Sequence, residues 1–273
     1  MLLSIVIPAW NEEIRLLPVL DRIRSYADAM LNGHGFEVIV VDDGSRDGTA
    51  DMVRQMAADW SELRLVSLTE NCGKGAAVRT GCVNARGEFI LLYDADGATP
   101  IEQEAVLRSE LSERHDLHLA MGVRYQHGAE VTMGVVRRSL GGLFAVCASL
   151  VVGRSCADTQ CGFKMIRRRT VLPLVRQCRE GGYTFDVELL AVTHRHRLAM
   201  CECRIPWTAM PGSKVSLWRD GPVMLWRLAA IWLRQMRGAF AQLPAVPERT
   251  LVASTSDAAK ITQPAELERT RHD

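Results

Sequence analysis

Residues 88–99 form an apolar strand-like segment that runs directly into two carboxylates, Asp94 and Asp96, separated by one residue. Two carboxylates in one turn repel each other unless a positive group lies between them, and a hard cation that bridges to phosphate oxygens supplies such a group. A plain surface turn is the alternative, because Asp-Gly is common turn chemistry. The segment therefore predicts a strand that ends either in a cation site or in an ordinary turn.

Three similar segments lie upstream, and each one ends in polar or glycine-rich residues. They are 2–8 followed by 9–13, 36–41 followed by 42–49, and 63–68 followed by 71–79. In an open parallel sheet the carboxyl ends of the strands meet at one edge, where the ligand crevice lies. We therefore expect the polar ends of all these segments to converge on one site.

The polar ends have chemistry that suits a nucleotide. Asp42 offers a carboxylate for a base or ribose, and the glycine-rich backbone around Lys74 suits phosphates. A capped turn at 42–48 and a left-handed entry into a helix at 73–75 are the plain alternatives. The Gly-Lys-Gly run at 73–75 is not a Walker loop, and no GxGxxG follows the first strand. P-loop kinases and dinucleotide dehydrogenases are therefore disfavoured.

Strand-like and helix-like segments alternate along the chain as far as about residue 111. A further strand is expected at 117–123, and helices are expected around 139–152 and 171–179. This alternation is typical of an α/β fold with a mostly parallel central sheet and helices on both faces.

Length and charge limit the class of protein further. A chain of 273 residues is long enough to bury a full core, and its formal net charge of +1 gives no case for a nucleic-acid partner. We expect the main domain at 1–217 and a basic amphipathic helix at 218–240. The remainder, 241–273, is polar and unpatterned, which predicts a disordered tail.

Three motifs in the second half of the chain are more specific than the strand ends. They read Asp-Thr-Gln-Cys-Gly-Phe-Lys at 158–164, Phe-Asp-Val-Glu-Leu-Leu at 185–190 and Gly-Ser-Lys at 212–214. Together with the segment around Asp94, these motifs resemble family-two glycosyltransferases of the GT-A fold. The chain is similar to the dolichyl-phosphate β-glucosyltransferases and the related polyprenyl-phosphate mannose synthases of that family, over residues 2–217.

The resemblance implies inverting transfer of a hexose from a nucleotide sugar to a polyprenyl phosphate of dolichyl or undecaprenyl type. It favours UDP-glucose over GDP-mannose as the donor. It assigns Asp94 to the ribose and the metal, and Asp96 to a Mg²⁺ or Mn²⁺ ion held against the diphosphate. The other residues that it places around the nucleotide are Pro8, Ala9, Asn11, Glu12, Asp42, Gly44, Lys74, Arg79 and Ala95. The mannose synthases carry a metal-holding glutamine where this chain has Ala98, which predicts a modest metal affinity.

On the acceptor side, the resemblance implies a set of basic residues that position the lipid phosphate: Arg124, Arg137, Arg138 and Lys214. A phosphate already carries a nucleophilic oxygen, so no general base is needed. A soluble or peptide-like acceptor with a hydroxyl would need one, and Asp158 is then the candidate. A catalytically silent nucleotide-sugar-binding partner is a third interpretation. It is disfavoured because the charged residues of the site are all present, namely Asp42, Asp94, Asp96 and Lys214.

The N-terminal apolar stretch and the segment 139–153 bear on where the protein lies in the cell. No signal peptide is recognisable, because Pro8 and the acidic residues that follow it interrupt the N-terminal apolar stretch. We therefore expect a protein of the cytoplasm or of the cytoplasmic membrane face. The segment 139–153 is uncharged but shorter than the roughly 20 residues that span a bilayer. It is therefore expected to be a packed or interfacial helix.

The segment 218–240 combines three tryptophans with arginines at helical spacing: Trp218, Trp226 and Trp232, and Arg227, Arg234 and Arg237. A basic helix with tryptophans opposite suits a membrane interface, where arginines meet lipid phosphates. An amphipathic helix packed on its own domain, or a dimer contact, fits the same pattern. The sequence leaves these interpretations open.

The eight cysteines are scattered and do not suggest a disulfide framework in a chain without an export signal. We expect reduced, mostly buried thiols. The one metal-like cluster, His194 and His196 with Cys201 and Cys203, matches no common zinc spacing, so a zinc site is disfavoured.

Overall fold

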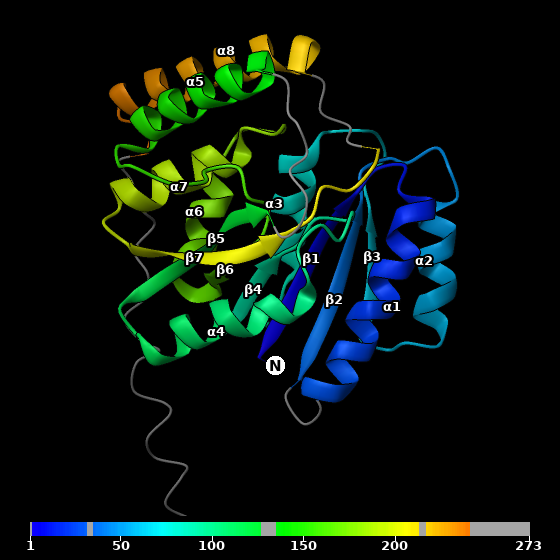
Figure 1. Ribbon diagram of the computed structural model, residues 1–273. Coiled ribbons are helices and arrows are strands. Elements are labelled where there is room, and N and C mark those ends of the chain that lie inside the picture. Colours follow the sequence, from blue (N-terminus) through cyan, green and yellow to red (C-terminus); the bar gives the residue numbers. More distant parts are fainter. Residues whose placement is uncertain (1, 32–34, 127–134, 213–216, 241–273) are drawn as a thin grey trace, which may run out of the picture. The chain divides into compact units, whose positions relative to one another are not determined.

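The computed structural model describes residues 2–31, 35–126, 135–212 and 217–240. Their strands form one sheet in the order β3-β2-β1-β4-β6-β5-β7, in which β6 runs antiparallel to both neighbours and the other adjacent strands are parallel (Figure 1). The strands are β1 Leu3–Ala9, β2 Phe36–Asp42, β3 Leu63–Ser67, β4 Phe89–Leu92, β5 Leu117–Gln126, β6 Lys164–Arg167 and β7 Ala199–Trp207.

Strand composition explains why the sheet lies in the middle of the domain. β2 reads Phe-Glu-Val-Ile-Val-Val-Asp and is buried over almost its whole length, as expected for a strand covered on both faces. β2 and β3 lie on one side of β1, whereas β4 lies on the other side. The carboxyl ends of β1 and β4 therefore flank the point where the strand order reverses, which is where open α/β sheets bind ligands.

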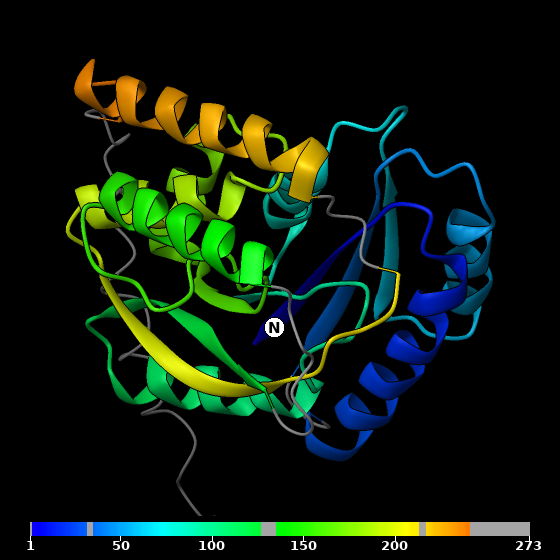
Figure 2. The same ribbon diagram turned by 45° about the horizontal axis from the view of Figure 1, so that its top comes forward.

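Helices cover both faces of the sheet, as the alternation of the sequence predicts (Figures 1 and 2). One face carries α1 Glu13–Met30, α2 Thr49–Ala58 and α4 Glu104–Glu113, with a short 3₁₀ turn at Ile101–Gln103 before α4. The opposite face carries α3 Lys74–Asn84, α6 Arg168–Gln177 and α7 Phe185–Arg195. Two further helices, α5 Val135–Val152 and α8 Leu217–Met236, lie side by side on the outer side of α7. The predicted α/β class is confirmed.

Alternate residues of the strands feed two apolar cores. Ile5 of β1 lies in the core under α1 and α4, whereas its neighbour Val6 lies in the core under α3 and α7. Removing one such side chain from water stabilises the fold by about 1.5 to 3 kcal/mol. The sheet is therefore fixed from both sides, and the strand ends are held in register.

α5 and α8 belong to the same packed body as the sheet. Leu228 and Ile231 of α8 are buried in the core shared with α7, and the Gln235 amide donates to the Val151 carbonyl of α5 at 3.1 Å. No helix in the described ranges is long and apolar enough to cross a membrane. The segment 139–153 lies largely in α5, which packs on the core through Ala148, Val151 and Val152, and the predicted tail at 241–273 lies outside the described residues.

The basic edge of α8 turns toward its own domain. The Arg234 guanidinium donates to Glu180 at 2.7 Å and to Glu188 at 2.9 Å, and Arg227 lies 3.9 Å from Glu180. Both glutamates are almost fully buried. Of the interpretations left open by the sequence, packing on its own domain therefore applies to Arg234, whereas Arg227 and Arg237 are exposed. Arg234 is not available to a lipid phosphate.

The outward faces of α5 and α8 are apolar. Trp226 is 72% exposed and Trp232 is 48% exposed. The other exposed apolar residues of the two helices include Leu143, Val146, Leu150, Val223, Leu225, Leu233 and Met236. We refer to these residues, with the two tryptophans, as the α5/α8 outer face.

The cysteines agree with the sequence-based expectation. All eight are free thiols, and five of them are buried: Cys82, Cys156, Cys161, Cys178 and Cys203. Among the described residues there is no group of three or more His, Cys, Asp or Glu side chains that could hold a metal by itself. The expectation of mostly buried thiols is confirmed.

Candidate active site

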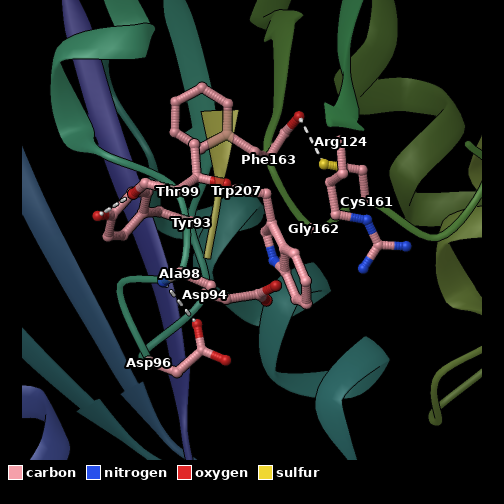
Figure 3. Close-up of a pocket in the computed structure, with 10 residues that line it drawn as sticks. All are labelled: Tyr93, Asp94, Asp96, Ala98, Thr99, Arg124, Cys161, Gly162, Phe163 and Trp207. Carbon is pink, nitrogen blue, oxygen red and sulfur yellow. Dashed lines mark hydrogen bonds between the residues drawn. The ribbon is translucent and has the colours of Figure 1, made fainter. Parts of the chain in front are cut away.

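The carboxyl end of β4 opens into a pocket (Figure 3). β4 is held beside β1 up to the Tyr93 N–H, which donates to the Val6 carbonyl at 3.0 Å, and the chain then leaves the sheet. The carboxylates of Asp94 and Asp96 follow at this point. The lining consists of Tyr93, Asp94, Asp96, Ala98, Thr99, Arg124, Cys161, Gly162, Phe163 and Trp207.

Asp94 is paired with Lys74. The Lys74 Nζ lies 2.6 Å from Asp94 Oδ1, across the gap between the first residue of α3 and the end of β4. Burial alone would raise the pKa of Asp94, but Lys74, helped by Lys164 and Arg124, holds that pKa below its ordinary value. Burial would lower the pKa of Lys74, and the neighbouring carboxylates of Asp94 and Asp186 raise it instead. Asp94 is therefore ionised and already has a cation beside it.

Asp96 has the opposite electrostatic balance. Burial, and next the charge of Asp94, raise the pKa of Asp96 above its ordinary value. The Ala98 N–H donates to Asp96 Oδ1 at 3.0 Å and fixes the orientation of the carboxylate. Two carboxylates that repel each other, one of them already drawing an ammonium, fit a site for a hard divalent cation. Mg²⁺ and Mn²⁺ are commonly held by one or two carboxylates, with phosphate oxygens and water completing the shell.

Arg124 enters the pocket from β5 and is held by Asp158. Its Nε donates to Asp158 Oδ2 at 2.6 Å and its Nη2 donates to Asp158 Oδ1 at 2.9 Å. The guanidinium also lies 5.5 Å from the centre of the Trp207 ring, within cation–π range. A bidentate pair of this kind fixes the plane of the guanidinium. Both Asp158 oxygens are engaged, so Asp158 would have to leave Arg124 before it could accept a proton.

The motif at 158–164 builds the floor of the pocket. The Lys164 ammonium is completely buried and donates to the carbonyls of Thr159 and Cys161 and to the carboxylate of Asp186. Phe163 packs edge-to-face on Tyr93 with ring centroids 5.7 Å apart. Gly162, the residue before Phe163, lies directly against Asp94.

The ends of β1 and β2 are joined to each other by hydrogen bonds. The side-chain oxygen of Asn11, Oδ1, accepts a hydrogen bond from the backbone N–H of Arg46 at 2.8 Å. The backbone N–H of Asn11 donates to Ser45 Oγ at 2.9 Å. Asp42 Oδ1 accepts from the Ser45 N–H at 3.0 Å, so the capped turn that the sequence allowed is present. Glu12 is held by a bidentate pair with Arg15 at 2.7 and 2.6 Å. These hydrogen-bonded loops form a wall at the edge predicted for the nucleotide.

The glycine-rich segment does not present its backbone to a phosphate. The N–H groups of Cys72 and Gly73 donate to the Asp43 carboxylate at 2.8 Å each. Those of Gly75 and Ala76 donate to the Gly181 carbonyl at 2.7 and 3.2 Å. The expectation that this backbone meets phosphates is therefore wrong for these four groups, because partners distant in the sequence already use them. Lys74 is the residue of the segment that reaches the carboxylates.

Gly73 has a structural reason of its own. Its φ of +92° lies in the left-handed region, and a Cβ there would meet the Gly181 carbonyl oxygen at 2.4 Å.

Arg79 also has a different place from the one predicted. Its Nη1 donates to the Cys178 carbonyl at 3.1 Å, at the end of α6. Five residues correspond to roughly 140° around a helix, so Arg79 does not share the face of Lys74. The structure therefore gives Arg79 a capping contact and does not bring it to Asp94.

The remaining predicted residues divide into three groups. Pro8 and Ala9 end β1, and Ala95 lies buried between the two carboxylates. Gly44, with φ +67°, lies so close to Glu70 that a Cβ would meet its carbonyl carbon at 2.5 Å. The last group cannot be placed: Lys214 lies outside the described residues, and so do the side chains of Arg137 and Arg138 in the first turn of α5.

Some residues in or behind the pocket were not among the predicted site residues. Trp207 ends β7 beside β5, so its place at a strand end was the available signal. Gly162 and Lys164 belong to a motif that the sequence singled out, but their contacts with Asp94 and Asp186 depend on elements far away in the chain.

Comparison with known proteins identifies the family. A model of the family described as "Glycosyl transferase family 2" matches residues 4–171. A dolichyl-phosphate beta-glucosyltransferase of Drosophila melanogaster is 36% identical over 249 residues, which cover 87% of this chain and 76% of the relative. The Homo sapiens dolichyl-phosphate beta-glucosyltransferase is 33% identical over 254 residues, covering 87% and 77%. That of Saccharomyces cerevisiae is 32% identical over 256 residues, covering 87% and 76%.

Solved structures agree on the fold. The crystal structure of a Mycobacterium tuberculosis glucosyl-3-phosphoglycerate synthase superposes with a TM-score of 0.62 at 22% identity and covers 86% of this chain and 80% of the other. The same enzyme in complex with Mn²⁺, UDP-glucose and glycerol 3-phosphate gives a TM-score of 0.59 at 23% identity, covering 86% and 79%. The expected GT-A fold is confirmed, and the chain belongs to glycosyl transferase family 2.

Proposed function

We propose that this glycosyltransferase moves glucose from UDP-glucose to a polyprenyl phosphate at the cytoplasmic face of a membrane, with inversion at the anomeric carbon and with a divalent cation. The observation that carries the proposal is the 36% identity with a dolichyl-phosphate beta-glucosyltransferase over 87% of the chain, which includes the Asp94 and Asp96 edge. GDP-mannose is the second donor that we consider, because the sequence also resembles the mannose synthases.

On the donor side, the nucleoside lies against the wall formed by the ends of β1 and β2, near Asn11 and Asp42. The diphosphate lies toward Asp94 and Asp96, which would hold Mg²⁺ or Mn²⁺. The bound ion supplies Lewis-acid stabilisation of the charge that builds on the leaving diphosphate. Lys74, 2.6 Å from Asp94, adds a fixed positive charge at the same place.

On the acceptor side, the phosphate of the lipid is the nucleophile. Its oxygen forms a bond to the anomeric carbon as the bond from that carbon to the UDP oxygen breaks, and attack opposite the leaving group inverts the centre. Arg124 is suited to receive the lipid phosphate, because its guanidinium lines the pocket and is oriented by Asp158. We retain Arg137, Arg138 and Lys214 as further candidates for this role.

The lipid acceptor requires that the pocket face a membrane, and the α5/α8 outer face supports such an orientation. β5 and β7 carry Arg124 and Trp207 at the pocket, and the chain continues from these two strands into α5 and α8. Exposed tryptophans beside aliphatic side chains suit the headgroup layer of a bilayer. We therefore propose a peripheral contact through this face rather than through Arg234.

The test is turnover of UDP-glucose and of GDP-mannose by the full chain with Mn²⁺, with and without a short polyprenyl phosphate in detergent. Nucleotide release and lipid-linked sugar are followed together. Lipid-dependent release of UDP with matching glycolipid is expected. Release without lipid product would point to a soluble acceptor, and the absence of turnover with every donor would point to a silent nucleotide-sugar-binding protein.

A further inference from the structure

Behind the pocket, four charged side chains of alternating sign lie in a row. Asp94 and Lys74 are 2.6 Å apart, Lys74 and Asp186 are 3.9 Å apart, and Asp186 and Lys164 are 2.7 Å apart. Asp94 comes from the turn after β4, and the other three come from α3, α7 and β6, so the row forms only in the folded chain. Asp94 lines the pocket, whereas Lys74, Asp186 and Lys164 do not.

Lys164 is an unusual residue for the place that it occupies. Its side chain is 0% exposed, and burying an ammonium is strongly unfavourable unless it is fully paired. Here the carbonyls of Thr159 and Cys161 and the Asp186 carboxylate surround it. Buried ion pairs of this kind often stabilise a protein less than apolar residues of the same volume. Stability alone therefore gives a weak reason for the pair.

Asp186 divides its two oxygens between two lysines. Asp186 Oδ1 accepts a hydrogen bond from Lys164 Nζ at 2.7 Å, and Asp186 Oδ2 lies 3.9 Å from Lys74 Nζ. Asp186 is the second residue of α7, where the helix dipole favours a negative charge. The Lys164 ammonium, at 2.7 Å, offsets part of the charge that Asp186 offers to Lys74. Lys74 accordingly lies closer to Asp94.

Lys74 thus lies between two carboxylates that differ in function. Asp94 is a candidate metal ligand, and a divalent cation must compete with the Lys74 ammonium for it. Asp186 offers Lys74 a second partner on the side away from the pocket. Without Asp186, the Lys74 ammonium would have no carboxylate beside it on the side away from the pocket once it left Asp94.

We propose that Asp186 and Lys164 are positioning residues that act through Lys74: they keep its ammonium within reach of Asp94 while allowing Asp94 to turn to the cation when the donor binds. This inference rests on the proposed function, because it requires a nucleotide-sugar site with a cation at Asp94. It also explains why the motifs at 158–164 and 185–190 occur together with Lys74.

The test measures Mn²⁺ affinity rather than catalysis. Mn²⁺ is titrated into the full chain at saturating UDP and fixed pH, without acceptor, and free Mn²⁺ is followed by electron paramagnetic resonance. Asp186→Asn is expected to raise the dissociation constant for Mn²⁺ by about threefold to tenfold, because Lys74 then remains on Asp94. In a Lys74→Met background, the same Asp186→Asn change is expected to have no effect.

The double-variant comparison distinguishes positioning from other causes. A direct field effect of the lost carboxylate, or general damage to the fold, would change Mn²⁺ affinity by the same factor in both backgrounds, and that result would overturn the inference. An unchanged affinity after Asp186→Asn in the otherwise natural chain would also overturn it. If Asp186→Asn folds poorly with Lys164 left unpaired, the neutral Lys164→Met/Asp186→Asn variant replaces it, with the same expectations in both backgrounds.

A matched control is Glu104→Gln. Glu104 is also fully buried and ion-paired, but its partners are Arg108 and Tyr26 on the other face of the sheet. Its loss is expected to lower stability without changing Mn²⁺ affinity.

If the natural chain itself binds no Mn²⁺ with UDP, the proposed function and this inference both fail. If it binds Mn²⁺ and the Asp186→Asn change has the same effect in both backgrounds, only the inference fails.

Discussion

Gly162 lies so close to Asp94 that a Cβ on Gly162 would come within 2.1 Å of Asp94 Oδ2 and 2.5 Å of the carboxyl carbon. The Asp94 carboxylate thus packs against the turn of the 158–164 motif and is also ion-paired with Lys74. The orientation of Asp94 therefore depends on a residue that has no side chain.

Gly162→Ala is expected to move the Asp94 carboxylate and to lower Mn²⁺-dependent turnover by roughly 100-fold, because a displacement of about 1 Å at a reacting centre has that order of effect. Turnover is followed as UDP release, and folding by circular dichroism. Gly142→Ala is the control, since a Cβ at Gly142 meets nothing within 4 Å. Full turnover by Gly162→Ala would show that Asp94 does not need its present orientation.

Arg124 and Asp158 are expected to act as one unit. Because both Asp158 oxygens accept from the guanidinium, Asp158→Asn, Arg124→Gln and the double variant should lose similar amounts of kcat/KM with polyprenyl phosphate. The measurement is a double-mutant cycle on steady-state rates. Losses that multiply, with Asp158→Asn showing a new pH dependence, would instead support Asp158 as a general base for a hydroxyl acceptor.

Arg234 is expected to matter for stability more than for lipid binding. Arg234→Met leaves the buried carboxylates of Glu180 and Glu188 without their main counter-charge, which should cost about 3 kcal/mol near pH 7. Urea unfolding measures this free energy. Arg54→Met is the control, because the Arg54–Asp51 pair is largely exposed and such pairs contribute about 0 to 1 kcal/mol.

The deficit of Arg234→Met should also depend on pH. Burial already raises the pKa of Glu188, although Arg234 opposes this, so removal of Arg234 raises the pKa further. A carboxyl with a raised folded-state pKa destabilises the fold as pH rises from its unfolded-state pKa to its folded-state pKa. The deficit should therefore be larger near pH 7 than near pH 5, where Glu188 is more often protonated. An equal deficit at both pH values would contradict this account of Glu188.

The α5/α8 outer face is expected to bind anionic liposomes. Trp226→Ser/Trp232→Ser should weaken co-sedimentation by roughly tenfold, because two large side chains no longer leave water on binding. Ile14→Ser is the control: Ile14 is 88% exposed, but it lies on α1, across the sheet from α5 and α8. Binding that is lost equally in both variants, or in neither, would remove this face as the contact.

Much of the site could be predicted because strand ends are local features of a sequence. The run into Asp94 and Asp96 and the end of β2 at Asp42 both follow apolar segments, and parallel strands bring such ends to one edge. The pairing of Arg124 with Asp158 was not predicted as a pair, although both residues were candidates. Their contact depends on how β5 meets the loop before β6.

The errors arose where a group had a distant partner that the sequence does not reveal. The N–H groups of the glycine-rich segment looked free, but Asp43 and Gly181 use them. Likewise, the spacing of Arg227 and Arg234 indicates a face of a helix without indicating which side is inward. Two buried glutamates determine that choice, and they lie about 50 residues upstream.

We propose that the Asp94 and Asp96 edge transfers a hexose from a nucleotide sugar to a lipid phosphate. This transfer is tested by mass spectrometry of the lipid extract from reactions with UDP-glucose, Mn²⁺ and polyprenyl phosphate, run in parallel with the natural chain and with Asp96→Asn. We predict that the lipid phosphate gains one hexosyl unit with the natural chain and none with the variant. An unchanged lipid while UDP accumulates, or an equal gain with Asp96→Asn, would contradict the claim.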